Sequence, residues 1–163
     1  VIFMVKKRHF LESENIDGNR YLSRLFKDEN IIVDATNGVE KITQSDIFKE
    51  RVYLEPLPNS TSKPTPAMTV GIYEVVGDGT FVNFFGSFGK NRPRWQESQV
   101  VQFCRNHRDK IRIGSYVTLF ELVNGFVVGV LIDDDNRLRA FVRSLLYPSV
   151  WQAYYRRRLV IPL

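Results

Sequence analysis

The sequence feature that most constrains this chain is a hairpin signal, Asn124-Gly125, which lies between two apolar runs. A two-residue loop of type I′ needs positive φ at both central positions, and Asn-Gly adopts that conformation at the lowest steric cost. The pair therefore predicts that residues 116–123 form a hairpin with residues 126–132. A polar turn at residues 133–136 then leads to a third strand, residues 138–146. Together these segments predict an antiparallel meander over residues 116–147.

The third strand of this meander has two different faces, because side chains in a strand alternate with a period of two residues. One face is apolar and carries Leu138, Ala140, Val142 and Leu146. The other face is basic with one ring and carries Arg137, Arg139, Phe141 and Arg143. We therefore expect the apolar face to lie on the core and the basic face to be available to a ligand.

The positive charge of the chain is concentrated in its C-terminal half. Residues 1–88 carry ten Lys and Arg against twelve Asp and Glu, whereas residues 89–163 carry thirteen against six. No acidic residue follows Asp135, although six arginines do. Such a surface attracts polyanions. The alternative is that the basic balance has no functional meaning, because many domains with a high isoelectric point bind no nucleic acid.

The remaining patterns predict an α+β fold. Residues 96–111 have apolar side chains at steps of three and four, which predicts one main helix. Strands are predicted at residues 1–5, 69–76 and 80–85, and a short helix at residues 20–27. The expected fold is a mostly antiparallel twisted sheet packed on the main helix (about residues 96–111), with a small N-terminal α/β piece.

A segment rich in Pro, Ser and Thr divides the chain. Residues 58–67, PNSTSKPTPA, lack periodic apolar positions, which is typical of a loop or linker. They separate a small N-terminal α/β unit, residues 1–57, from a main α+β unit, residues 68–163. A length of 163 residues also permits one continuous domain, residues 1–163.

Cysteine content and hydropathy bear on the cellular location of the protein. A single cysteine excludes an internal disulfide framework and a multi-cysteine metal site. No apolar run approaches the roughly 20 residues of a membrane helix. The apolar residues 1–5 precede the basic residues 6–8, which is the reverse of a secretory signal. We therefore expect a cytoplasmic protein with no membrane partner.

Candidate catalytic groups are few. Cys104 and His107 lie three residues apart on the predicted helix, as a nucleophile and its base need. Both fall among apolar positions, however, which favours a core cysteine and a boundary histidine. Asp133, Asp134 and Asp135 lack the spacing of a calcium loop, which favours a solvated turn. The sequence therefore predicts no catalytic residue, no metal site and no cofactor.

Glu121 is the most interesting acid, because it lies in an otherwise apolar predicted strand. A buried carboxylate needs a partner. Arg139 and Arg143 are the expected partners, since they lie on the third strand of the same meander. A structural ion pair is favoured over a catalytic acid, and both interpretations stay open at this point.

The remaining signal consists of basic residues interleaved with rings. Phosphate contacts come from Lys and Arg, and single-stranded bases stack on aromatic side chains. The candidate binding residues are Arg137, Arg139, Phe141, Arg143, Arg156, Arg157, Arg158, Lys90, Arg92 and Arg94. They predict a non-enzymatic binding module, with nucleic acid as the first expected partner. The alternatives are a protein-interaction or assembly subunit that uses the same surface, and an enzyme with an unrecognised site. The oligomeric state is not predicted.

Residues 69–163 also carry a characteristic order of motifs. TVGIYEVV is followed by TFVNFFGSFG, by ESQVVQFCRNHRDKIR, by the aliphatic meander and by VWQAYYRRRLVIPL. This order resembles a family of uncharacterised bacterial proteins, many of them from candidate-phylum bacteria. The resemblance implies a bacterial, intracellular protein and no particular activity, because no function is known for that family. It carries over no functional residue.

Overall fold

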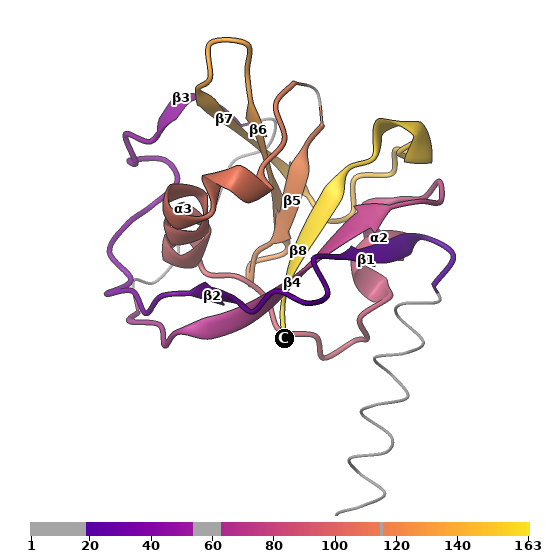
Figure 1. Ribbon diagram of the computed structural model, residues 1–163, viewed down its shortest axis with the longest axis horizontal. Coiled ribbons are helices and arrows are strands. Elements are labelled where there is room, and N and C mark those ends of the chain that lie inside the picture. Colours follow the sequence, from indigo (N-terminus) through magenta and orange to yellow (C-terminus); the bar gives the residue numbers. More distant parts are fainter. Residues whose placement is uncertain (1–18, 54–62, 115) are drawn as a thin grey trace, which may run out of the picture.

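The computed structural model describes residues 19–53, 63–114 and 116–163 (Figure 1). The strand expected at residues 1–5 and residues 58–62 of the expected linker lie outside this part of the chain. The described residues form one mixed sheet of eight strands with two short α-helices. Figure 1 shows the strands fanning out in a strongly twisted sheet, with β8 between β4 and β5.

The strands come from the whole length of the described chain. Their bounds are β1 Leu22–Leu25, β2 Ile31–Val33, β3 Phe48–Tyr53, β4 Met68–Val75, β5 Thr118–Glu121, β6 Phe126–Ile132, β7 Leu138–Ser144 and β8 Arg158–Pro162. Neighbouring strands follow the order β1–β4–β8–β5–β6–β7–β3, and β2 pairs with the other half of β4. The β5–β8 and β3–β7 pairings are parallel and the others are antiparallel. Residues far apart in sequence therefore meet throughout the sheet.

The predicted meander is confirmed, because β5 pairs with β6 and β6 with β7, both antiparallel. The predicted turn type is wrong, since of the two turn residues only Gly125 has positive φ, at +84°. The Gly125 N–H donates to the Leu122 carbonyl oxygen at 3.3 Å, and the Leu122 N–H donates to the Phe126 carbonyl oxygen at 2.8 Å. The hairpin is thus closed by a single left-handed glycine.

Both faces of the sheet are covered, which explains why β5 and β6 are apolar at nearly every position. Helix α3, Glu97–Asn106, packs on one face. The fully buried rings on that face are Trp95, Phe103 and Phe120. The short helix α2, Phe81–Gly86, packs on the other face. Its buried side chains are Phe81, Phe84 and Phe85.

The expected fold, a sheet packed on one main helix at about residues 96–111, is wrong. The described chain is mostly sheet, and α3 is only ten residues long. It ends at Asn106 because His107 leaves helical geometry (φ −123°, ψ 37°), and a 3₁₀ turn, Arg108–Lys110, follows. Ile111 still reaches the core next to α3. The apolar spacing therefore suggested a longer helix than the one that forms.

Two segments have the opposite secondary structure to the one expected. Of residues 80–85, expected as a strand, Thr80 is the N-cap of α2 and residues 81–85 form most of that helix. Thr80 Oγ1 accepts the Asn83 N–H at 3.2 Å and Asn83 Oδ1 accepts the Thr80 N–H at 2.9 Å, so a capping box begins this helix. Residues 20–27, expected as a helix, contain β1. Leu22 packs on the α2 face and Leu25 on the α3 face, as residues at odd spacing do in a strand.

The expected N-terminal α/β piece is not separate from the rest. Strands β1 and β2 pair with β4, which opens the C-terminal part of the chain. Strand β3 pairs in parallel with β7 and forms the far edge of the same sheet. Pairings of this kind join distant residues, so no local pattern in the sequence shows them.

Candidate functional site

The turn before β7 neutralises part of the basic face predicted on that strand. Arg139 Nε lies 2.7 Å from Asp133 Oδ2, and Lys49 Nζ lies 3.6 Å from the same oxygen. The Arg137 N–H, which donates to Asp133 Oδ1 at 3.0 Å, is the main cause of a lowered pKa of the Asp133 carboxyl, and Arg139 and Lys49 add to it. The Arg137 side chain itself is exposed. Arg139 is therefore paired with an acid of the turn that precedes its strand.

The other half of the β7 face lies against neighbouring side chains. The Phe141 ring covers Gly129 of β6, where an added Cβ atom would overlap it. The Arg143 guanidinium lies 3.9 Å from the centroid of the Tyr147 ring. Arg143 has no carboxylate partner in the described part of the chain. On the predicted face, Arg143 thus stacks on a ring and lacks a carboxylate partner among the described residues.

The basic loop before α3 is bound to Glu121, whose side chain is only 3% exposed. Arg92 makes a bidentate contact, with Nε 2.7 Å from Glu121 Oε1 and NH2 2.8 Å from Oε2. Arg94 Nε lies 3.3 Å from Glu121 Oε2. The structural ion pair is confirmed, but the partners expected on β7 are wrong. Lys90, the third cation of this loop, is exposed.

The arginines that enter β8 differ in their surroundings. Arg158 NH1 donates to the Lys110 carbonyl oxygen at 2.7 Å, and burial lowers the pKa of its guanidinium. Arg158 also lies opposite Glu74 of β4 in the strand pairing. Arg156 precedes it with a left-handed backbone, φ +45°, and an exposed side chain. Arg156 makes no ion pair with any residue that the structure describes.

Arginines and rings stack in turn along residues 143–157. The Tyr147 and Trp151 ring centroids lie 6.1 Å apart. The Arg157 guanidinium lies 4.5 Å from the Trp151 centroid and 5.0 Å from that of Tyr155. Together with Arg143 on Tyr147, these contacts form a continuous series. We call it the arginine–aromatic ladder, and its members are Arg143, Tyr147, Trp151, Tyr155 and Arg157.

The ladder carries donors that lack acceptors. Burial lowers the pKa of the Arg157 guanidinium, and its NH1 atom is buried without a hydrogen-bond partner among the described residues. The indole Nε1 atom of Trp151 is likewise buried without a hydrogen-bond partner among the described residues. No acidic residue follows Asp135 in the sequence. The ladder is therefore positive and rich in donors, with no carboxylate of its own.

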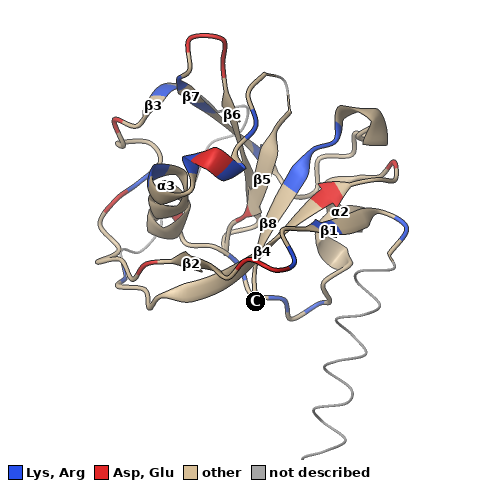
Figure 2. Ribbon diagram, in the orientation of Figure 1, with Lys and Arg blue, Asp and Glu red and all other residues tan. Residues whose placement is uncertain are grey.

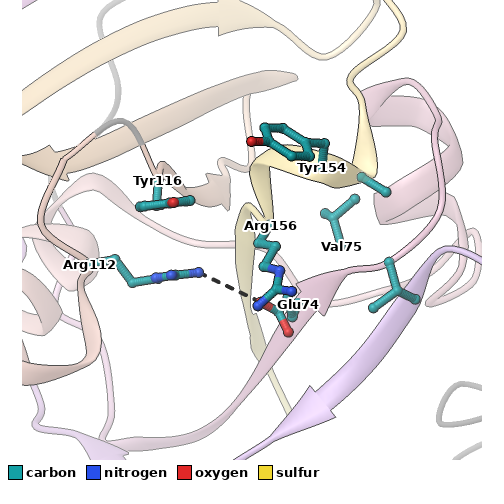
Figure 3. Close-up of a pocket in the computed structure, with 8 residues that line it drawn as sticks. Glu74, Val75, Arg112, Tyr116, Tyr154 and Arg156 are labelled. Carbon is teal, nitrogen blue, oxygen red and sulfur yellow. Dashed lines mark ion pairs between the residues drawn. The ribbon is translucent and has the colours of Figure 1, made fainter.

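An open cleft of about 670 Å³ lies next to the ladder. It is lined by Glu74, Val75, Val76, Arg112, Tyr116, Ala153, Tyr154 and Arg156. We call it the Arg112–Arg156 cleft. Figure 3 shows the Tyr116 ring beside Arg112 on one side of it, and Tyr154 and Arg156 on another side. Tyr154 joins the cleft to the ladder, because its ring centroid lies 5.5 Å from that of Tyr155.

The cleft combines cations with accessible rings. The Arg112 guanidinium lies 3.9 Å from the Tyr116 centroid, and its NH1 atom lies 3.6 Å from Glu74 Oε1. Tyr154 is 83% exposed. Figure 2 shows basic residues at the start of β8 beside an acidic one near the end of β4. This arrangement offers cations to phosphates and ring faces to planar groups.

Arg112 and Tyr116 are site residues that the sequence analysis missed. From the sequence, Arg112 was expected on the polar side of the predicted helix and Tyr116 in the first strand of the meander. In the structure they lie two residues before and two residues after Gly114, which has a left-handed backbone with φ +94°. The only sequence signal was an Arg and a Tyr on either side of a turn glycine, and many surface turns share it.

The other candidate groups have structural roles. Cys104 is buried, as expected of a core cysteine, and burial raises the pKa of its thiol. His107 Nε2 lies 2.7 Å from the Ile32 carbonyl oxygen. No group of three or more His, Cys, Asp or Glu is placed to hold a metal ion within residues 19–53, 63–114 and 116–163.

Comparisons with family models, with curated proteins and with solved structures found no match for this chain. The resemblance to uncharacterised bacterial proteins, and with it the bacterial origin, therefore stays a prediction. No helix among the described residues is both long enough and apolar enough to span a membrane.

Proposed function

We propose that this chain is a non-enzymatic module that binds single-stranded nucleic acid in the Arg112–Arg156 cleft and along the arginine–aromatic ladder. The observation that carries the proposal is the pairing of an exposed, unpaired cation, Arg156, with an 83% exposed ring, Tyr154, at an open cleft. Lys and Arg supply phosphate contacts and rings supply stacking platforms. The proposal agrees with the cytoplasmic location expected from the sequence.

The exposed rings favour a single strand over a duplex. Bases in a duplex are stacked on each other, so their faces do not reach a protein side chain. A single strand presents those faces, and stacking of one base on one ring is worth roughly 1–3 kcal/mol. Tyr154 and Tyr155 offer such faces beside Arg156. The recognition expected from these side chains tolerates many base sequences.

The ten predicted binding residues differ in what their side chains contact. Arg92, Arg94 and Arg139 are held by carboxylates within the chain. Phe141 covers Gly129, and Arg158 is largely committed to a backbone carbonyl. Arg143, Arg156 and Arg157 belong to the ladder or line the cleft, whereas the exposed Arg137 and Lys90 belong to neither.

We expect a fluorescein-labelled single-stranded oligothymidylate to bind the full chain in a fluorescence-anisotropy titration at low salt. The logarithm of the association constant should fall linearly with the logarithm of the salt concentration, because phosphate neutralisation releases counterions. Arg156→Glu should weaken binding about tenfold or more, since it replaces a phosphate contact by a repulsive charge. The melting temperature should not change, because Arg156 is exposed and unpaired.

The matched control is Arg105→Glu, which makes the same change of charge away from the cleft. Arg105 pairs with Glu40 on the exposed side of α3, with NH1 2.6 Å from Oε1. This variant should bind within about twofold of the wild-type chain, since only long-range, salt-screened electrostatics changes. Equal losses in both variants would point to non-specific attraction and would contradict the cleft. Absence of wild-type binding at low salt would reject the proposal.

A protein-interaction or assembly role is the alternative that a specific observation favours. Leu146 and Val150 belong to the segment that joins β7 to the cleft residue Ala153 and are 76% and 63% exposed. Exposed apolar side chains beside Arg and Tyr are also common at protein interfaces. A chain that fails to bind nucleic acid at low salt but forms a complex weakened by Leu146→Ser would support this alternative instead.

A further inference from the structure

Glu74 is the one carboxylate among the residues that line the Arg112–Arg156 cleft. It belongs to β4 and projects toward Arg112, as the dashed line in Figure 3 shows. It also lies opposite Arg158 in the pairing of β4 with β8. A site expected to hold phosphates thus contains a negative charge at its base, and that charge needs an explanation.

The contact of Glu74 with Arg112 is looser than the other arginine–carboxylate pairs. Arg112 NH1 lies 3.6 Å from Glu74 Oε1, beyond a hydrogen bond. By contrast, the shortest contacts to Glu121 and Glu40 measure 2.7 and 2.6 Å. Both Glu74 and Arg112 are partly exposed, at 22% and 28%. Such an ion pair contributes little to stability, and another anion can replace it.

Arg112 does not depend on Glu74 for its position. Its guanidinium lies 3.9 Å from the Tyr116 centroid, so the ring supports it from another direction. Cation–π stacking keeps a guanidinium in place while its N–H groups stay free for an anion. Loss of the Glu74 charge should therefore leave Arg112 at the cleft with an unneutralised charge.

We infer that Glu74 is an internal competitor for the phosphate. It neutralises Arg112 in the empty cleft, and a phosphate of the bound strand takes its place beside that guanidinium. The inference rests on the proposed function and adds a regulatory element to it: Glu74 lowers the affinity of the cleft for any weakly held anion. Removal of this carboxylate should tighten binding, whereas removal of a residue that merely shapes a site weakens it.

The test is Glu74→Gln, titrated with the same labelled oligothymidylate. We expect about fivefold tighter binding, since an exposed charge pair is worth up to about 1 kcal/mol and 1.4 kcal/mol is tenfold. The slope of the salt dependence should become more negative by up to about 0.7, the contribution of one further phosphate contact on a single strand. Glu74→Thr, which suits a strand, should shift both quantities in the same direction.

Glu40→Gln is the matched control, because it also removes one negative charge and frees one arginine, Arg105. It should leave the affinity within about 1.5-fold of the wild-type chain, as screening limits distant charges. A wild-type chain that binds, together with Glu74 variants that bind equally or more weakly, would overturn the inference alone. A wild-type chain that does not bind would overturn the proposed function and this inference together.

Discussion

Glu121→Gln should lower the free energy of unfolding by about 3–5 kcal/mol, because it leaves buried positive charge without a partner. Glu121 is 3% exposed, and the Arg92 side chain that pairs with it is only 10% exposed. Arg94 lies 3.3 Å from the same carboxylate, so one substitution removes the counter-charge of two cations. Urea denaturation followed by tryptophan fluorescence measures this loss, since Trp95 directly follows Arg94 in the chain.

Glu40→Gln serves here as well as a control, because it breaks an exposed pair of similar geometry. Its expected loss is below about 1 kcal/mol. Replacement of Glu121, Arg92 and Arg94 together by apolar residues should recover most of the stability, as buried ion pairs tolerate apolar replacement better than the loss of one partner. A loss below 1 kcal/mol for Glu121→Gln would show that water reaches the two arginines.

The sequence identified Glu121 as a buried acid that needs a partner, but it could not identify the partner. Glu121 lies opposite Val127 in β6, which lies opposite Arg143 in β7. Arg143 is thus in the expected row but two strands away, roughly 10 Å at the usual strand spacing. Arg92 reaches Glu121 because Trp95 pairs in parallel with Leu122, the residue directly after β5. That bridge depends on a non-local contact.

The same limit applies to the fold as a whole. The β5–β6–β7 meander was predictable because its strands are consecutive and a glycine turn sets their register. The insertion of β8 between β4 and β5, and the parallel pairing of β3 with β7, join residues that are distant in sequence. Helix α2 had a readable signal in Thr80 and Asn83, but a run of apolar residues next to it also fits a strand.

The cleft depends on strand pairings that could not be predicted from the sequence. Glu74 and Arg158 face each other only because β8 pairs with β4. Arg112 comes from the segment before β5, and β5 pairs with the edge of β8 opposite to β4. Arg156 was predictable as an exposed cation from its run of three arginines. Its surroundings were not, since they come from three segments of the chain.

Trp95→Ala should lower the free energy of unfolding by about 3–5 kcal/mol, the range for removing a large buried ring. Trp95 is fully buried, and its ring meets those of Phe103 and Phe120 edge to face at centroid distances of 5.9 and 5.0 Å. Its indole N–H donates to the Val160 carbonyl oxygen at 2.8 Å, which ties the segment just before α3 to β8. The large cavity left by alanine would lie between helix and sheet.

Trp95→Phe separates the hydrogen bond from the packing. It keeps a ring in the cluster but removes the donor to Val160, so we expect a loss of about 1–3 kcal/mol. Tyr154→Ala is the control for removing a ring without burial, and it should change stability by less than about 0.5 kcal/mol. Thermal denaturation followed by circular dichroism measures all three variants. If Trp95→Ala were no more destabilising than Trp95→Phe, the ring cluster would contribute little, and the stabilising role of Trp95 would depend on its hydrogen bond to β8.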